Sequence, residues 1–289
     1  MKLGVFTPVV VQHPASSSEW ERSAGIDAVA RIAEAADELG YYYLSCSEHV
    51  AIPTATAVER GGTYWDPLAT LGFLAARTRR IRLATQVLVL GYHHPLAVAK
   101  RYGTLDVVSN GRLILGVGVG SLQEEFELLG AQFEGRGSVA DDAMRALRAS
   151  LGETEPSYTG EHFSFTDLTI SPAALQDHVP MWVGGRSMRS LRRAAALGDG
   201  WVPFGLSHDE IGAMLSRVET PDRFEVVLST GAPLNPTADP SGSRAAVEQT
   251  RDAGATVATA GIAARDADHY CDQLAALAAL AREAGVDLA

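Results

Sequence analysis

Short apolar runs alternate with segments of helical periodicity along the whole chain of 289 residues, without a linker-like break. The runs are bounded by turn residues and are too short for buried helices, so each indicates a buried strand. A strand followed by a helix, repeated eight times, is typical of a closed parallel barrel. The pattern therefore predicts a (β/α)8 TIM barrel that forms a single domain over residues 1–289. A doubly wound open sheet is the alternative.

Eight apolar runs are expected to form the barrel strands. They are Lys2–Phe6, Tyr41–Cys46, Arg82–Val89, Leu113–Val117, Met181–Val183, Gly200–Phe204, Phe224–Ser229 and Thr256–Ala260. The clearest helical patterns between them span Ile26–Leu39, Pro67–Arg77 and Leu96–Val108. Gly40 follows the first of these helices and Pro67 opens the second, which are the positions that glycine and proline favour.

One long segment between the fourth and fifth strands, residues 119–179, interrupts this alternation. It contains helical patterns at Leu122–Leu129 and Asp141–Leu151, followed by the alternating stretch SYTGEHFSFTDLTI. The alternation predicts a hairpin with its turn at Thr159-Gly160. A long insertion after a barrel strand lies at the C-terminal face, where active sites are built. The insertion is therefore a candidate substrate lid, and the alternative is an excursion without a role in the site.

Composition and charge argue against several classes of partner and of site. The formal net charge of −11 argues against nucleic acid, because phosphate backbones favour a basic protein surface. Only two cysteines are present, Cys46 and Cys271, far apart in the sequence, which predicts neither a disulfide scaffold nor a cysteine zinc site. No apolar run is long enough to span a membrane, and the N-terminal residues fit a strand better than a signal peptide. We therefore expect a cytoplasmic protein that does not bind nucleic acid or a membrane.

Polar side chains at strand ends are the candidates for chemistry. Glu48 and His49 directly follow the second strand, and histidine exchanges a proton near neutral pH. The alternative is a loop pair that caps the next segment. Thr85 and Gln86 interrupt the apolar third strand. They are either hydrogen-bonded core residues or the mark of a strand that bulges toward a ligand.

Glycines at two strand ends indicate a bound ligand, because a missing side chain allows close approach to the backbone. Gly118 and Gly120 follow the fourth strand, and Gly184 and Gly185 precede a helix beside Arg186. Free backbone N–H groups at a helix start, together with a guanidinium, favour an anion such as phosphate. Glycine pairs also serve tight turns, which is the alternative here.

Other polar groups are not expected to carry chemistry. His93 and His94 are adjacent, so their side chains point in different directions, and we interpret them as loop residues. The scattered histidines form no metal-binding set. Arg79, Arg80 and Arg82 lie before or at the start of the third strand, at the opposite end of the barrel, and are expected to be solvated.

Several segments, in their order and spacing, resemble the bacterial luciferase-like monooxygenase superfamily, and within it the branch that uses the deazaflavin coenzyme F-420. These segments are SEHVAIP, TQVLVLGYHHP, LDVVSNGRLILGVGVG, PSYTGEHFSF and WVGGRSMRSLRRAAALGDGW. The resemblance covers roughly residues 1–204 and fades in the last third of the chain.

The resemblance implies a TIM barrel with the deazaflavin ring at its C-terminal mouth and with His49 and Glu48 as catalytic residues. It also implies a cis peptide between Gln86 and Val87, and a phosphate close to Arg186. The cofactor-binding residues that it implies are Glu48, His49, Thr85, Gln86, Val87, Gly118, Gly120, Gly184, Gly185 and Arg186.

The activity implied by the resemblance is hydride transfer between F-420 and a small organic substrate, in a homodimer. The alternatives are a two-component monooxygenase that uses reduced FMN and oxygen, and a flavin-binding protein without turnover. A barrel aldolase or isomerase is less favoured, because no lysine lies at a strand end. Two positions depart from the family pattern. Ser121 stands where relatives often carry tryptophan or glutamate, and Gln86 stands where a smaller residue is common.

Overall fold

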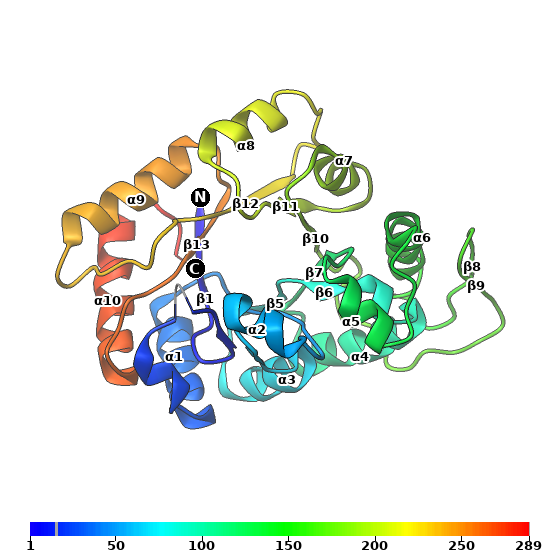
Figure 1. The fold of residues 1–289 in the computed structure, drawn as a ribbon, viewed down its shortest axis with the longest axis horizontal. Coiled ribbons are helices and arrows are strands. Elements are labelled where there is room, and N and C mark those ends of the chain that lie inside the picture. The colour runs from blue at the N-terminus through cyan, green and yellow to red at the C-terminus, as the bar shows by residue number, and fades with distance from the viewer. Residues whose placement is uncertain (15–16, 289) are drawn as a thin grey trace.

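The computed structural model describes residues 1–14 and 17–288, in which eight parallel strands close into a barrel surrounded by helices (Figure 1). The barrel strands are β1 Lys2–Phe6, β3 Tyr43–Cys46, β5 Arg82–Thr85, β7 Leu113–Gly118, β10 Met181–Gly184, β11 Gly200–Val202, β12 Glu225–Ser229 and β13 Val257–Ala260. Their order is β10, β11, β12, β13, β1, β3, β5 and β7, and β7 pairs with β10 to close the ring. The predicted TIM barrel is confirmed, and the open sheet is excluded.

One helix follows each barrel strand and covers the outside of the barrel (Figure 1). These helices are α1 Ile26–Leu39, α3 Pro67–Arg77, α4 Pro95–Val108, α6 Arg136–Arg148, α7 Met188–Leu197, α8 His208–Leu215, α9 Pro240–Asp252 and α10 Ala267–Glu283. Residues at the ends of two helices have the roles predicted from the sequence or typical of their type. Gly40 ends α1 at a φ of 87°, and Asp66 accepts a hydrogen bond from the N–H of Ala69 at the start of α3.

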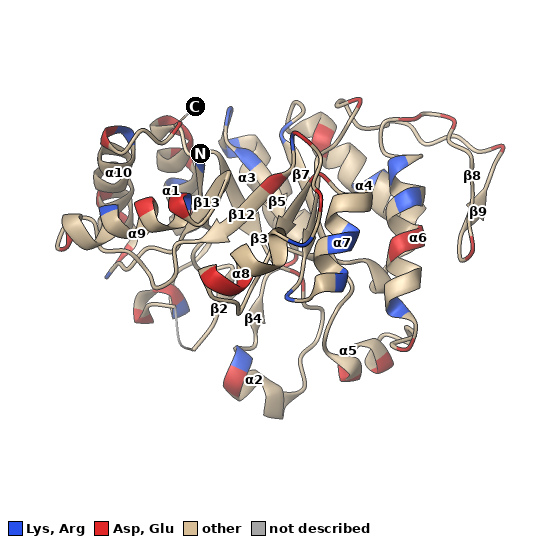
Figure 2. Cartoon of the chain, turned by 90° about the horizontal axis from the view of Figure 1, so that it is seen from above, with Lys and Arg blue, Asp and Glu red and all other residues tan. Residues whose placement is uncertain are grey.

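Shorter elements gather at the C-terminal end of the barrel. Strand β2 (Val11–Gln12) pairs antiparallel with β4 (Thr63–Tyr64), and helix α2 spans Thr54–Arg60. Helices α2 and α5 (Gln123–Leu128) project from the same side of the molecule, away from the two termini (Figure 2). The sequence pattern did not predict β2, β4 or α2, because elements this short show no clear periodicity.

The segment between β7 and β10 is divided between two sides of the molecule, which corrects two expectations. Helix α6, predicted as part of an insertion from Asp141, is a regular outer helix of the barrel, and the hairpin β8–β9 (Tyr158–Thr159 and Ser164–Phe165) lies beyond it (Figures 1 and 2). The hairpin turn spans residues 160–163 and not Thr159-Gly160, because Thr159 pairs with Ser164. The hydroxyl of Tyr158 donates to Asp142 of α6 at 2.5 Å and ties the hairpin down. Only the first part of the segment, with α5, adjoins the barrel mouth.

Side chains fill the barrel interior and close it below the mouth. The rings of Tyr43 and Trp182 meet edge to face, with centroids 5.1 Å apart. The indole N–H of Trp182 donates to Glu225 at 2.8 Å, and Glu225 pairs with Lys2 at 2.8 Å. Gly4 leaves the space that the Tyr43 ring needs, because a Cβ there would lie 2.1 Å from the ring. A ligand is therefore expected at the mouth and not within the barrel.

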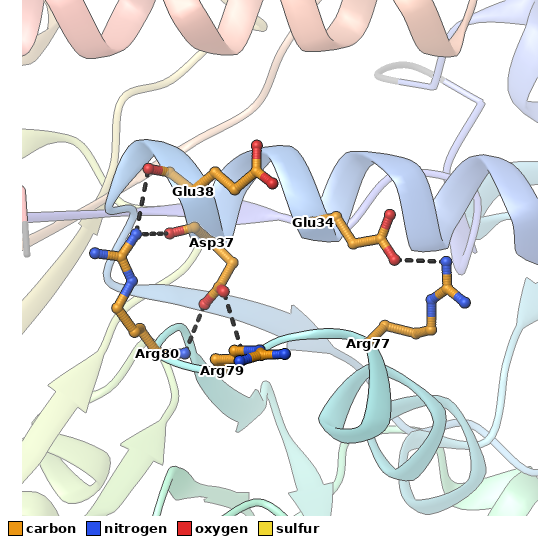
Figure 3. A pocket seen from close by; sticks show the side chains of 6 residues that line it. All are labelled: Glu34, Asp37, Glu38, Arg77, Arg79 and Arg80. Carbon is orange, nitrogen blue, oxygen red and sulfur yellow. Dashed lines mark hydrogen bonds and ion pairs between the residues drawn. The ribbon is translucent and has the colours of Figure 1, made fainter.

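A hollow of about 320 Å³ at the N-terminal end of the barrel is lined by charged side chains of α1, of the end of α3 and of the turn before β5 (Figure 3). The carboxylate of Asp37 accepts hydrogen bonds from the backbone N–H groups of Arg79 at 3.0 Å, Arg80 at 2.7 Å and Ile81 at 2.6 Å. The guanidinium of Arg80 donates to the backbone carbonyls of Asp37 and Glu38. These contacts join α1 to the strand that carries part of the candidate site.

Arg79 and Arg80 are exposed, as predicted. Arg82 is half-buried and donates to the carbonyl of Leu113 at 3.0 Å and to Gln176 at 2.8 Å, so the prediction that it is solvated is wrong.

We expect Asp37→Asn to lower the free energy of unfolding by about 1–3 kcal/mol at pH 7, because the amide nitrogen cannot accept a hydrogen bond. Burial alone would raise the pKa of the Asp37 carboxyl, but the N–H groups of Ile81, Arg80 and Arg79 hold it below its ordinary value. A lowered folded-state pKa stabilises the fold above the unfolded-state pKa, and this stabilisation is lost as the pH falls through the folded-state value.

Urea unfolding of wild type and Asp37→Asn at several pH values measures this contribution. The difference should be full at pH 7 and should shrink as the pH falls below about 4. Glu38→Gln, an exposed position on the same helix, is the matched control and should change stability little. A difference that does not vary with pH, or an equal loss in the control, would contradict the assigned role.

Candidate functional site

The site residues expected from the sequence gather along one half of the barrel mouth. They follow β3, β5, β7 and β10, which are consecutive neighbours in the barrel. Because the carboxyl ends of parallel strands meet at one face, these residues form a continuous rim.

The Gln86–Val87 peptide is cis, as the resemblance predicts, and it separates β5 from the short strand β6 (Leu88–Val89). Val87 fills the space beside two of the predicted glycines, because a Cβ at Gly118 or Gly184 would lie 2.7 or 2.8 Å from its methyl carbons. Gly120 likewise faces the ring of Phe126, which would lie 2.5 Å from a Cβ at this position. The packing of the protein itself therefore requires all three glycines, in addition to any ligand.

Thr85 and Gln86, the two polar residues of the predicted third strand, have different environments. Thr85 is a hydrogen-bonded core residue, and Gln86 lies where the strand ends at the mouth. Thr85 is fully buried, and its hydroxyl donates to the carbonyl of Gly116 at 2.7 Å, as a hydrogen-bonded core residue does. Gln86 is half-buried at the end of the strand. Its backbone carbonyl accepts from the hydroxyl of Ser47 at 2.6 Å. Thr85 supports the rim from inside, and Gln86 is the member of the pair that adjoins the mouth.

His49 is held in one orientation by an acid that the sequence analysis did not identify. Its Nδ1 lies 2.7 Å from the carboxylate of Glu125 on α5, and its ring packs edge to face against Tyr64 of β4, with centroids 4.6 Å apart. The side chain is 19% exposed, and no other described residue bonds its Nε2. Because Nδ1 is occupied, Nε2 is the atom available for proton exchange with a ligand.

Glu125 also organises the loop after β3. Its fully buried carboxylate accepts from the backbone N–H groups of Val50 at 2.6 Å and Ala51 at 3.1 Å, and from the hydroxyl of Tyr92 at 2.8 Å. Burial alone would raise the pKa of Glu125, but the hydrogen bonds from His49, Tyr92 and Ala51 hold it below its ordinary value. The acid that contacts the histidine, Glu125, lies four residues after Ser121, the position where the resemblance allows a tryptophan or a glutamate.

Glu48 is directed away from His49 and has a different environment. Its side chain is buried, one oxygen lies 2.7 Å from Nε2 of His93, and the other accepts from the N–H of Val89 at 2.7 Å. His93, interpreted from the sequence as a plain loop residue, is thus a partner of this carboxylate. With both oxygens engaged, Glu48 is suited to positioning β6, and His49 is the member of the pair with an available atom.

The start of α7 offers donors for an anion, although not those expected. The N–H of Gly185 donates to the carbonyl of Val202 at 3.2 Å and is therefore occupied. The backbone N–H groups of Arg186, Met188 and Arg189 donate to no other residue in the described part of the chain. The side chains of Arg186 and Arg189 are exposed. This end of α7 can hold a phosphate through backbone N–H groups and a guanidinium.

A hollow of about 320 Å³, which the sequence analysis did not predict, opens beside this rim at the ends of β1, β3, β12 and β13. Phe6, Pro233 and Ile262 give it apolar walls, and Thr7 and Ser45 add hydroxyl groups. Its size and largely apolar lining suit a small organic molecule.

The loops and short helices around the mouth also carry exposed apolar side chains. Val50 is 57% exposed, Val58 of α2 76%, Leu128 of α5 66% and Phe204 after β11 55%. Apolar groups gathered on one face are typical of a surface that meets a ligand or covers one.

Residues 1–14 and 17–288 contain no helix that is long and apolar enough to cross a membrane. The same residues include no cluster of three or more histidine, cysteine, aspartate or glutamate side chains placed to hold a metal ion.

Known proteins share both sequence and fold with this chain. The family model of the luciferase-like monooxygenases matches residues 1–239. An uncharacterized protein of Mycobacterium tuberculosis, Rv0940c, is 29% identical over 200 residues, which are 65% of this chain and 69% of the relative.

Two solved structures share the fold at low sequence identity. The monooxygenase RslO1 from Streptomyces bottropensis has a TM-score of 0.77 at 23% identity, over 99% of this chain and 100% of its own. The coenzyme F420-dependent tetrahydromethanopterin reductase from Methanopyrus kandleri has a TM-score of 0.72 at 14% identity, over 96% and 98% of the two chains.

Proposed function

The chain belongs to the luciferase-like monooxygenase family, and we propose that it transfers a hydride between the deazaflavin coenzyme F-420 and a small organic substrate. The family contains monooxygenases and other oxidoreductases. The observation that carries the proposal is His49, which Glu125 fixes through Nδ1 and which keeps Nε2 available at the barrel mouth.

The rim fits a flavin-type cofactor in its shape and in its donors. Val87, packed between Gly118 and Gly184, gives an apolar platform for a ring. The N-terminus of α7, with Arg186, supplies N–H donors and positive charge for a phosphate. When bound, the cofactor supplies the hydride chemistry, and the protein supplies orientation and electrostatics.

The hollow beside β1 and β13 is the proposed substrate site. Ser47 lines the hollow, and its hydroxyl donates to the carbonyl of Gln86 at the platform. The hollow and the platform therefore share a wall, which brings a substrate next to the ring. The exposed apolar residues on α2 and α5 would exclude water from this contact.

His49 is the proposed proton-exchange group. When a carbonyl is reduced, its oxygen takes up a proton, and in the reverse reaction the hydroxyl loses one. Nε2 of His49 is available for both directions, because the contact between Nδ1 and Glu125 determines which ring nitrogen faces the mouth. Glu48 acts on the shape of the site by holding the N–H of Val89.

A two-component monooxygenase that uses reduced FMN is the second candidate, and the fold shared with RslO1 favours it. Oxygen consumption distinguishes the two reactions. On our proposal, small alcohols reduce F-420 without oxygen, with loss of the visible absorption band of the oxidised coenzyme. Consumption of oxygen with reduced FMN and substrate, without F-420 turnover, would establish the alternative.

We expect Arg186→Glu to weaken F-420 binding about tenfold, which is about 1.4 kcal/mol, because the carboxylate repels the phosphate. The loss should be larger at low ionic strength, where screening is weakest. Equilibrium titrations at two salt concentrations measure it. Arg192→Glu, an exposed position farther along α7, makes the same change in net charge and should have a smaller effect. Equal losses in both variants would argue against a phosphate at Arg186.

A further inference from the structure

A chain of hydrogen bonds crosses the barrel interior from β13 to the rim. The hydroxyl of Tyr43 on β3 is hydrogen-bonded to the hydroxyl of Thr259 on β13. The same Tyr43 hydroxyl donates to the side-chain Oε1 of Gln86 at 3.2 Å. Tyr43 and Thr259 are almost completely buried, and Gln86 is half-buried where β5 ends. The chain therefore joins the core to the mouth.

The Tyr43 hydroxyl has little freedom to move. The ring is fully buried, it fills the space that Gly4 leaves, and it packs edge to face against Trp182. Burial raises the pKa of Tyr43, so the hydroxyl remains protonated and able to donate. Gln86 is consequently held at its side chain by Tyr43 and at its backbone carbonyl by Ser47.

This arrangement determines which end of the Gln86 carboxamide is available. Oε1 is engaged on the core side, so the Nε2 amino group is the other end of the amide, and it donates to no residue in the described ranges. An amide nitrogen carries two N–H donors and no acceptor.

We propose that Gln86 donates a hydrogen bond through Nε2 to a carbonyl oxygen of the ring bound at the mouth, and that Tyr43 and Thr259 position it. The inference rests on the proposed function, because it takes a flavin-type ring as the ligand. Tyr43 and Thr259 are positioning residues, since they act only through Gln86. This hydrogen bond would act together with the two cofactor contacts proposed above, which are the packing of the ring on Val87 and the binding of the phosphate at the start of α7.

Titrations of F-420 and FMN into wild type and variants test the proposal. Gln86→Met keeps the length of the side chain and removes the donors, and it should weaken binding of the ring about tenfold. Tyr43→Phe keeps the packed ring and should weaken binding about threefold, because the carboxamide is then free to rotate. The visible absorption band of the bound cofactor should shift back toward that of the free cofactor in both variants.

A double-mutant cycle separates positioning from a general structural effect. The variant that combines Tyr43→Phe with Gln86→Met should bind no more weakly than Gln86→Met alone, because Tyr43 acts through Gln86. Tyr42→Phe is the matched control. The Tyr42 hydroxyl accepts from Lys2 at 3.1 Å, in the network at the opposite end of the barrel, and its loss should leave the affinity unchanged.

Each outcome supports or overturns the proposal. Wild-type affinity and an unshifted band in Gln86→Met would overturn the hydrogen bond to the ring. Additive losses in the double variant would overturn the positioning role of Tyr43. Failure of wild type itself to bind either cofactor would overturn the proposed function together with this inference, whereas normal wild-type binding with an unaffected Gln86→Met overturns the inference alone.

Discussion

Replacing His49 with alanine should lower turnover by about 10²–10⁴-fold, while the affinity for F-420 changes by less than about threefold. On our proposal, Nε2 of His49 is the proton-exchange atom at the mouth. The proposed phosphate site and ring platform would contribute most of the cofactor binding. The loss therefore falls on the proton-transfer step and not on the cofactor complex.

The rate of F-420 reduction by a panel of small alcohols, measured beside an F-420 titration, separates these two effects. His162→Ala is the control, because His162 is exposed near the β8–β9 hairpin, on the far side of α6 from the mouth. A folded His49→Ala protein with wild-type turnover would remove the assigned role.

Removing the carboxylate of Glu125 should have the second largest effect. Glu125→Ala leaves His49 without its Nδ1 contact and leaves the N–H groups of Val50 and Ala51 without an acceptor in a buried place. Each such loss costs about 1–3 kcal/mol, so we expect turnover to fall by about 10–100-fold and the loop after β3 to become more sensitive to proteolysis. Glu125→Gln keeps one acceptor oxygen and should lose less.

Acid titration gives a second measure of Glu125. Its folded-state pKa is lowered, so its contribution to stability is present above the unfolded-state value of about 4.3 and is lost as the pH falls through the folded-state value. Glu124→Ala, an exposed neighbour on α5, is the control for both measurements. Equal behaviour of Glu124→Ala and Glu125→Ala would mean that the carboxylate does not organise His49.

The barrel could be predicted because its signals are local. Each strand is an apolar run, the first helix has a clear periodicity of its own, and Gly40 and Pro67 mark helix boundaries by their own backbone preferences. The short elements β2, β4 and α2 lack such signals. Their positions depend on contacts with distant segments, such as the packing of Tyr64 on His49.

The partners of the candidate residues could not be predicted for the same reason. Glu125 lies 76 residues from His49 in the sequence, and His93 lies 45 residues from Glu48. Only the closed barrel brings these pairs together. The role of a glycine could not be predicted for a different reason. A glycine that leaves room for a ligand and a glycine that leaves room for the side chain of Val87 cannot be distinguished in a sequence. The cis peptide follows from the family resemblance and not from the local residue pattern.

Side-by-side titration of the protein with F-420 and FMN tests the central claim most directly. Our account predicts saturable binding of F-420, tighter than that of FMN, with the difference reduced in Arg186→Glu. Binding of FMN at least as tight as that of F-420, with oxygen consumed in the presence of substrate, would contradict it and identify a monooxygenase. Binding of neither cofactor would contradict the proposed function and leave the family membership and the barrel fold unaffected.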